Sequence, residues 1–106
     1  MTEMIPIVRR IREAKEAAMS DFREMGYDII KSDNEIFCFI ASKAAGPAML
    51  HECKVRVVVD EITDKDKTLV KKQRLFPSQT KVILCRKFGH RKFIRIEFDY
   101  LNNPCQ

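Results

Sequence analysis

The stretch between residues 51 and 64 holds the only spacing in the chain with a catalytic interpretation. Glu52 and Lys54 lie two residues apart in a run that predicts a β-strand. Alternate residues of a strand project to the same face, so the carboxylate and the amine are expected side by side. A carboxylate can bind a divalent cation, and an ammonium group can neutralise charge that develops during a reaction. The alternative is a solvated or ion-paired strand face without chemistry.

The cysteines and histidines predict structural roles more than catalytic ones. The four cysteines, Cys38, Cys53, Cys85 and Cys105, form no CxxC pair, which disfavours a zinc ribbon or a thioredoxin-like site. Three of them lie in apolar strand-like runs, where a free cysteine usually packs as a small hydrophobe. His51 shares a strand face with Cys53, but nothing else indicates the base and oxyanion site that a cysteine nucleophile needs. The chain has no P-loop, GxGxxG, HExxH or GxSxG motif, so nucleotide hydrolysis, dinucleotide redox chemistry and serine hydrolysis have no support.

Positive charge is concentrated in the second half of the chain. Residues 65–95 contain eleven Lys or Arg and one acid, Asp66, whereas residues 1–64 contain nine basic and twelve acidic residues. This basic region suits a polyanion such as nucleic acid, and it equally fits a solvated lysine-rich surface. Phe88 and Phe93 lie between the cations, a mixture that suits base stacking beside phosphate contacts. The candidate nucleic-acid-binding residues are Lys71, Lys72, Arg86, Lys87, His90, Arg91 and Lys92.

Two segments have the signals of helices. Apolar residues spaced at i, i+4 and i+7 predict a helix over residues 4–25, with Gly26 as its C-terminal cap. Thr63 is a typical N-cap residue and predicts a second helix that runs to about Arg74 and is ended by Pro77.

Five apolar or alternating segments predict β-strands. They span residues 27–31, 35–42, 49–62, 80–87 and 92–98. The order is therefore helix, three strands, helix, two strands. A helix between the third and fourth strands allows a right-handed parallel crossover. The expected fold class is α/β (α+β), with one mixed five-stranded sheet and helices packed on it.

Length and composition indicate one soluble globular domain. A chain of 106 residues is long enough for one compact core, and its 45% hydrophobic and 33% charged content is typical of globular proteins. No apolar run approaches the roughly 20 residues of a membrane helix, and the N-terminus has no apolar signal-peptide core. We therefore expect a cytoplasmic protein with a single domain over residues 1–106, a core over about 4–98 and a frayed tail at 102–106.

The element order resembles the core of the PD-(D/E)XK nuclease superfamily, the restriction-endonuclease-like fold. That core has a helix, three antiparallel strands, a helix and a further strand, which here corresponds to about residues 4–98. The resemblance implies a catalytic site made of Asp33, Glu52 and Lys54. Asp33 and Glu52 would hold a metal ion such as Mg²⁺, and Lys54 would orient a water or neutralise charge. The chain departs from the family pattern because no Pro-Asp pair opens the second strand, where Glu35 is the nearest substitute for Asp33.

Together these features predict a small basic domain that binds nucleic acid and resembles a nuclease core, in a catalytically degenerate form. One alternative is a non-enzymatic protein-interaction or dimerisation module, which would form a homodimer and whose charged strand face would be structural. The other is an active Mg²⁺-dependent nuclease, which is the only case in which a cofactor is expected. No membrane partner is expected.

Overall fold

The computed structural model describes residues 6–32, 35–75 and 78–99. Two helices and five strands follow the expected order α-β-β-β-α-β-β. They are α1 (Ile7–Glu24), β1 (Asp28–Lys31), β2 (Phe39–Gly46), β3 (Met49–Val59), α2 (Asp64–Lys71), β4 (Gln79–Arg86) and β5 (Ile94–Asp99). The predicted α+β class, with one mixed five-stranded sheet, is confirmed. The predicted C-terminal tail and Asp33 lie outside the described residues.

The five strands lie in the sheet in the same order as in the sequence. β1, β2 and β3 form an antiparallel meander, β4 runs parallel to β3, and β5 is antiparallel to β4. The parallel pair requires a crossover, and α2 provides it between β3 and β4. The predicted crossover and the predicted hairpin of the last two strands are both present.

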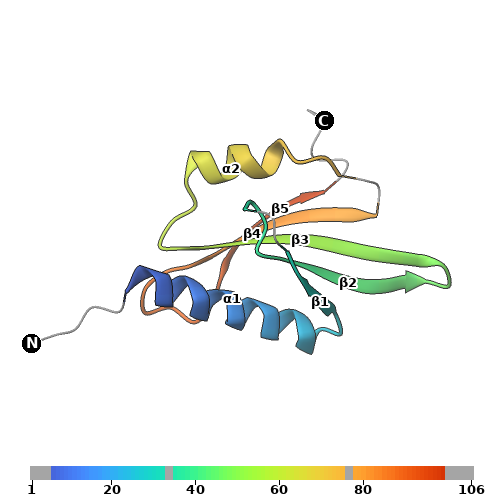
Figure 1. Ribbon diagram of the computed structural model, residues 1–106, viewed down its shortest axis with the longest axis horizontal. Coiled ribbons are helices and arrows are strands. Elements are labelled where there is room, and N and C mark those ends of the chain that lie inside the picture. The colour runs from blue at the N-terminus through green and yellow to red at the C-terminus, as the bar shows by residue number, and fades with distance from the viewer. Residues whose placement is uncertain (1–5, 33–34, 76–77, 100–106) are drawn as a thin grey trace, which may run out of the picture.

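The two helices cover opposite faces of the sheet (Figure 1). The larger core lies between α1 and the sheet, and the smaller core lies on the side of α2. The α1-side core contains Ala14, Ala18, Phe22, Phe39, Ala41, Cys53, Val55, Val57, Val82 and Leu84. The α2-side core contains Phe37, Val70, Ile83 and Phe98. We refer to the two sides of the sheet as the α1 face and the α2 face.

The apolar stripe of α1 is buried only in its middle. Ala14, Ala18 and Phe22 are buried, whereas Ile7 and Met25, at the two ends of the predicted stripe, are 51% and 48% exposed. The helix therefore extends past the sheet surface that it covers. Gly26 has a φ of +90° and follows the C-cap, which confirms the predicted cap because this conformation favours glycine.

The second strand begins later than the sequence predicts. The expected strand covers residues 35–42, but β2 spans Phe39–Gly46, so it also ends four residues later than predicted. In a continuous strand, Phe37 and Phe39 would share one face. Instead Phe37 packs in the α2-side core and Phe39 in the α1-side core, so the chain breaks its extended run between them.

The third strand has the two faces that its sequence predicts. Cys53, Val55 and Val57 are buried in the α1-side core, and the intervening charged residues lie on the α2 face. The strand ends at Val59 instead of residue 62, because Asp60 takes a φ of +69° and turns the chain out of the sheet.

Candidate functional site

Glu52 and Lys54 lie on the α2 face of β3, as the Glu-x-Lys spacing predicts. In the register of the sheet, Glu52 lies between Ser42 on β2 and Gln79 on β4. The Nε2 atom of Gln79 donates a hydrogen bond to Oε1 of Glu52 over 2.9 Å. Ser42 and Gln79 are each 9% exposed, so the carboxylate lies in a polar row that is mostly covered.

Lys54 lies next to a second lysine, Lys81, which no sequence motif marks as part of a site. Lys81 is its partner on β4 and is completely buried. Its Nζ atom donates to the carbonyl oxygens of Lys71, at 3.2 Å, and Gln73, at 2.7 Å, at the C-terminal end of α2. Burial, together with the nearby Lys54, lowers the pKa of Lys81 to about 8. The only indication in the sequence is a lysine that interrupts an apolar strand.

The described residues around Glu52 do not fit a Mg²⁺ site. A divalent ion needs several oxygen ligands, and the β2 residue opposite Glu52 is a serine. Asp28 lies in the same cross-strand row but two strands away, roughly 10 Å. Within the described ranges, no group of three or more His, Cys, Asp or Glu side chains could hold a metal ion.

Of the two acids proposed at the second strand, only Glu35 lies within the described residues. Asp33 lies outside the described residues. The carbonyl oxygen of Glu35 accepts from Arg56, which lies four residues, or roughly 13 Å, along β3 from Glu52. The catalytic assignment of Asp33, Glu52 and Lys54 therefore stays a prediction, with only Glu52 and Lys54 brought together.

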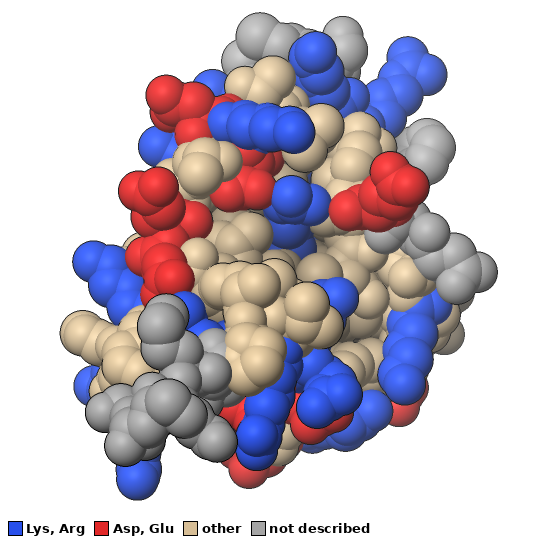
Figure 2. Space-filling model, turned by 60° about the vertical axis from the view of Figure 1, so that its left-hand side comes forward, with Lys and Arg blue, Asp and Glu red and all other residues tan. Residues whose placement is uncertain are grey.

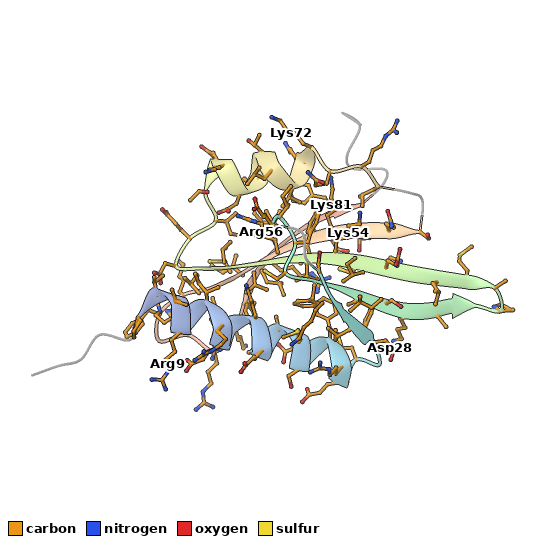
Figure 3. The ribbon with its side chains drawn as sticks, viewed as in Figure 1. Arg9, Asp28, Lys54, Arg56, Lys72 and Lys81 are labelled. Carbon is orange, nitrogen blue, oxygen red and sulfur yellow. The ribbon has the colours of Figure 1, made fainter. Side chains whose placement is uncertain are left out.

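Arg56 of β3 holds α2 against the sheet through hydrogen bonds to Asp66. Its Nε and Nη2 atoms donate to Oδ1 of Asp66 over 3.0 and 2.9 Å, and its Nη1 atom donates to the carbonyl of Ile36 over 2.8 Å. Asp66 also accepts from the backbone and hydroxyl of Thr63, in a capping box at the start of α2. Burial alone would raise the pKa of Asp66, but the hydrogen bonds from Thr63 and Arg56 outweigh it and lower that pKa. Figure 3 shows Arg56, Lys54 and Lys81 on the α2 side of the sheet.

A basic hollow lies on the other side, between the N-terminal part of α1 and the turn that joins β4 to β5. We call residues 87–93 the β4–β5 turn. The hollow has a volume of about 280 Å³. The hollow is lined by four Lys or Arg residues and one histidine. They are Arg10 from α1, Arg86 at the end of β4, and Lys87, His90 and Arg91 from the turn. Glu13 is the acid in the lining, and it pairs with Arg9 at 3.1 Å.

Asp60 connects the parts that surround this hollow. Its carboxylate accepts two hydrogen bonds from the guanidinium of Arg10, one of them over 3.0 Å, and one from the backbone N–H of Phe88 over 3.3 Å. The hydrogen bond from Arg10 is the largest cause that lowers the pKa of Asp60 below its usual value. Asp60 thus ties the end of β3 to α1 and to the β4–β5 turn.

A second hollow, of about 390 Å³, lies beside the first and shares Arg91 with it. Lys92, Phe93 and Arg95 contribute to its lining, together with Asp21 of α1 and its C-cap residue Met25. The two hollows follow α1 along the β4–β5 hairpin. Phe93 packs against the α1-side core.

The predicted nucleic-acid-binding residues separate into two groups. Arg86, Lys87, His90, Arg91 and Lys92 gather at the C-terminal end of β4 around the two hollows. Lys71 and Lys72 lie at the end of α2, beside the start of β4, where the carbonyl of Lys71 binds Lys81. Figure 3 shows Lys72 on the α2 side of the sheet and Arg9 on the α1 side.

Charge on the surface is mixed. Figure 2 shows one face of the molecule, where basic side chains lie along the lower margin and at the top and acidic side chains gather at the upper left.

The cysteines of the described chain have structural positions. Cys53 and Cys85 are buried free thiols, 2% and 1% exposed, and Cys38 is half-buried. Burial raises the pKa of the Cys53 and Cys85 thiols, which disfavours the reactive thiolate. Cys105 lies outside the described residues.

Comparison of the chain with models of known protein families, with curated proteins and with solved structures gave no significant match. Within the described ranges, no helix combines the length and the apolar character needed to cross a membrane.

Proposed function

We propose that this protein is a nucleic-acid-binding domain that uses the α1 face at the β4–β5 turn. The observation that supports the proposal is the basic hollow, in which Arg10 of α1 meets Arg86, Lys87, His90 and Arg91. Several cations around one hollow can contact successive phosphates of a strand, and each contact releases bound counterions. The exposed ring of Phe88 beside these cations offers a surface for a base.

We assign a structural role to Glu52 and Lys54. Gln79 donates a hydrogen bond to one carboxylate oxygen of Glu52, and a serine lies opposite Glu52 on β2. Lys54 lies beside the buried Lys81. This surrounding suits a polar row within the sheet more than a metal-dependent cleavage site, and it agrees with a catalytically degenerate relative of a nuclease core.

Two pairs of lysines provide a matched test of the proposal. The pair Lys87 and Lys92 lies on the β4–β5 turn, and the pair Lys71 and Lys72 lies at the end of α2; all four are exposed. Binding of a fluorescently labelled oligonucleotide is measured by anisotropy at low salt. We expect Lys87→Ala/Lys92→Ala to weaken binding about tenfold, because two phosphate contacts are lost, and Lys71→Ala/Lys72→Ala to change it less than about threefold.

Both double variants remove the same net charge, so a general effect of charge would weaken both equally. An equal loss in the two variants would contradict the assigned surface. The absence of any binding by the wild-type protein at low salt would contradict the function itself.

A further inference from the structure

Phe88 is an aromatic side chain held in an exposed position. It is 69% exposed, at the tip of the β4–β5 turn. Burying a phenylalanine normally stabilises a protein, and the chain instead leaves this ring in water. Next to it the chain turns at Gly89, which has a φ of +78°.

The position of the ring is fixed from several sides. The N–H of Phe88 donates to Asp60, and the guanidinium of Arg10 lies over the ring, 5.0 Å from its centroid. Arg10 is itself held by two hydrogen bonds to Asp60. The turn is closed by the Nε atom of Arg86, which donates to the carbonyl of His90 over 3.0 Å. The ring is therefore preorganised, with a cation over it and much of its surface open.

The surroundings of the ring point to one class of ligand. An exposed aromatic ring can stack on a flat apolar group, and the cations that line the adjacent hollow select a ligand with negative charge. A nucleotide strand has both parts, a base that can stack and a phosphate that can contact Lys87 or Arg91. A duplex keeps its base faces stacked inside, so only an unpaired base can reach the ring.

We propose that Phe88 is a stacking platform for an unpaired nucleobase, and that the β4–β5 turn therefore prefers single-stranded over double-stranded nucleic acid. This inference rests on the proposed function. Asp60 and Arg10 act as positioning residues, since they hold the ring and the guanidinium in one arrangement without providing the stacking surface.

The composition of the chain allows a direct test by fluorescence. The protein contains no tryptophan, so Phe88→Trp introduces a single indole at the proposed platform. We expect a short single strand to quench this indole as it binds, because a stacked base quenches tryptophan emission. The control is Met49→Trp, which places the indole at a 59% exposed position at the start of β3.

Three ligands separate stacking from charge attraction: a labelled single strand, the same strand without bases, and a duplex. We expect quenching of Phe88→Trp by the single strand at least fivefold greater than by the abasic strand or the duplex, and little quenching of Met49→Trp. Anisotropy of the label reports binding independently of the indole. Phe88→Ala is expected to weaken binding of the single strand about tenfold and binding of the abasic strand less than twofold.

Strand binding without quenching of Phe88→Trp, or with equal quenching of Met49→Trp, would overturn the platform and leave the proposed function standing. Equal affinity of the protein for single strand and duplex would also overturn it. No change in anisotropy with any of the three ligands would remove both the platform and the proposed function.

Discussion

Lys81 is the residue whose environment differs most from that of an ordinary side chain of its type. Lysine is rarely buried, because its ammonium group loses water, yet Lys81 has no exposed surface. Two carbonyl oxygens at the end of α2 accept its hydrogen bonds, and the ring of Phe98 lies 5.8 Å from its Nζ atom. These contacts join α2 to the middle of the sheet at the expense of a desolvated charge.

The stability of the protein should consequently depend on pH through Lys81. Its pKa is about 8 in the folded chain and near the ordinary 10.5 in the unfolded chain. Between these values the unfolded chain binds the proton and the folded chain does not, so the free energy of unfolding rises with pH. We expect Lys81 to contribute a rise of about 1 to 3 kcal/mol between pH 8 and pH 10.5, measured by denaturant unfolding.

The comparison with Lys81→Met isolates this contribution, because all other groups titrate in both proteins. The difference in unfolding free energy, wild type minus variant, should grow as the pH rises through this window. Parallel curves for the two proteins would show that the Lys81 ammonium group is not destabilised by burial.

At the level of single residues, the sequence predicts which side chains of one strand lie side by side, but it does not predict contacts between side chains of different elements. Glu52 and Lys54 share a face because strands alternate, and no further information is needed. The contact of Arg10 with Asp60 joins residues fifty positions apart, and only the packing of α1 against the end of β3 brings them together. The hydrogen bond from Gln79 to Glu52 likewise depends on the register of the parallel pair.

Among the elements, α2 is the one that depends most on a few polar contacts. It has eight residues, and Asp66 and Val70 are its buried positions. Asp66 closes the capping box with Thr63 and receives the guanidinium of Arg56. Short helices gain most of their stability from such tertiary contacts and caps.

Asp66→Asn should therefore destabilise the protein by about 3 kcal/mol, because it leaves the mostly buried Arg56 without its anion. Asp64→Asn is the matched control, since Asp64 is an exposed acid in the same first turn, and a loss of about 0.5 kcal/mol is expected there. Urea unfolding at neutral pH measures both. Similar losses of unfolding free energy in the two variants would show that Asp66 stabilises the protein through the helix dipole and not through its pair with Arg56.

The positions of the elements follow from the sequence better than their ends do. The helix periods, the cap at Gly26 and the alternation in β3 place α1, β3 and the crossover helix correctly along the chain, although α2 ends at Lys71 and not at the predicted Arg74. The start of β2 is missed because Phe37 and Phe39 serve cores on opposite faces, which a pattern of apolar residues cannot distinguish. The outer end of β2 is missed because exposed residues such as Lys43 and Ala44 carry no apolar pattern.

For the whole molecule, the sequence predicts how much positive charge there is but not where it gathers. Within the described ranges, the predicted nucleic-acid-binding residues divide between the two ends of β4, and those at the β4–β5 turn meet α1 around a hollow. The nuclease resemblance is consistent with the α-β-β-β-α-β-β order. It remains an expectation, because the described residues around Glu52 do not provide a metal site.

The place on the protein where a nucleic-acid strand binds decides between the β4–β5 turn and the other basic groups. With a mass of 12.4 kDa, the protein suits amide chemical-shift mapping by NMR during titration with a short single strand at low salt. We expect the largest shifts at residues 86–92 and at Arg10, and small shifts at Lys71 and Lys72. The largest shifts at the end of α2 or around Glu52, or no shifts at all, would contradict the claim that this protein binds nucleic acid at the β4–β5 turn.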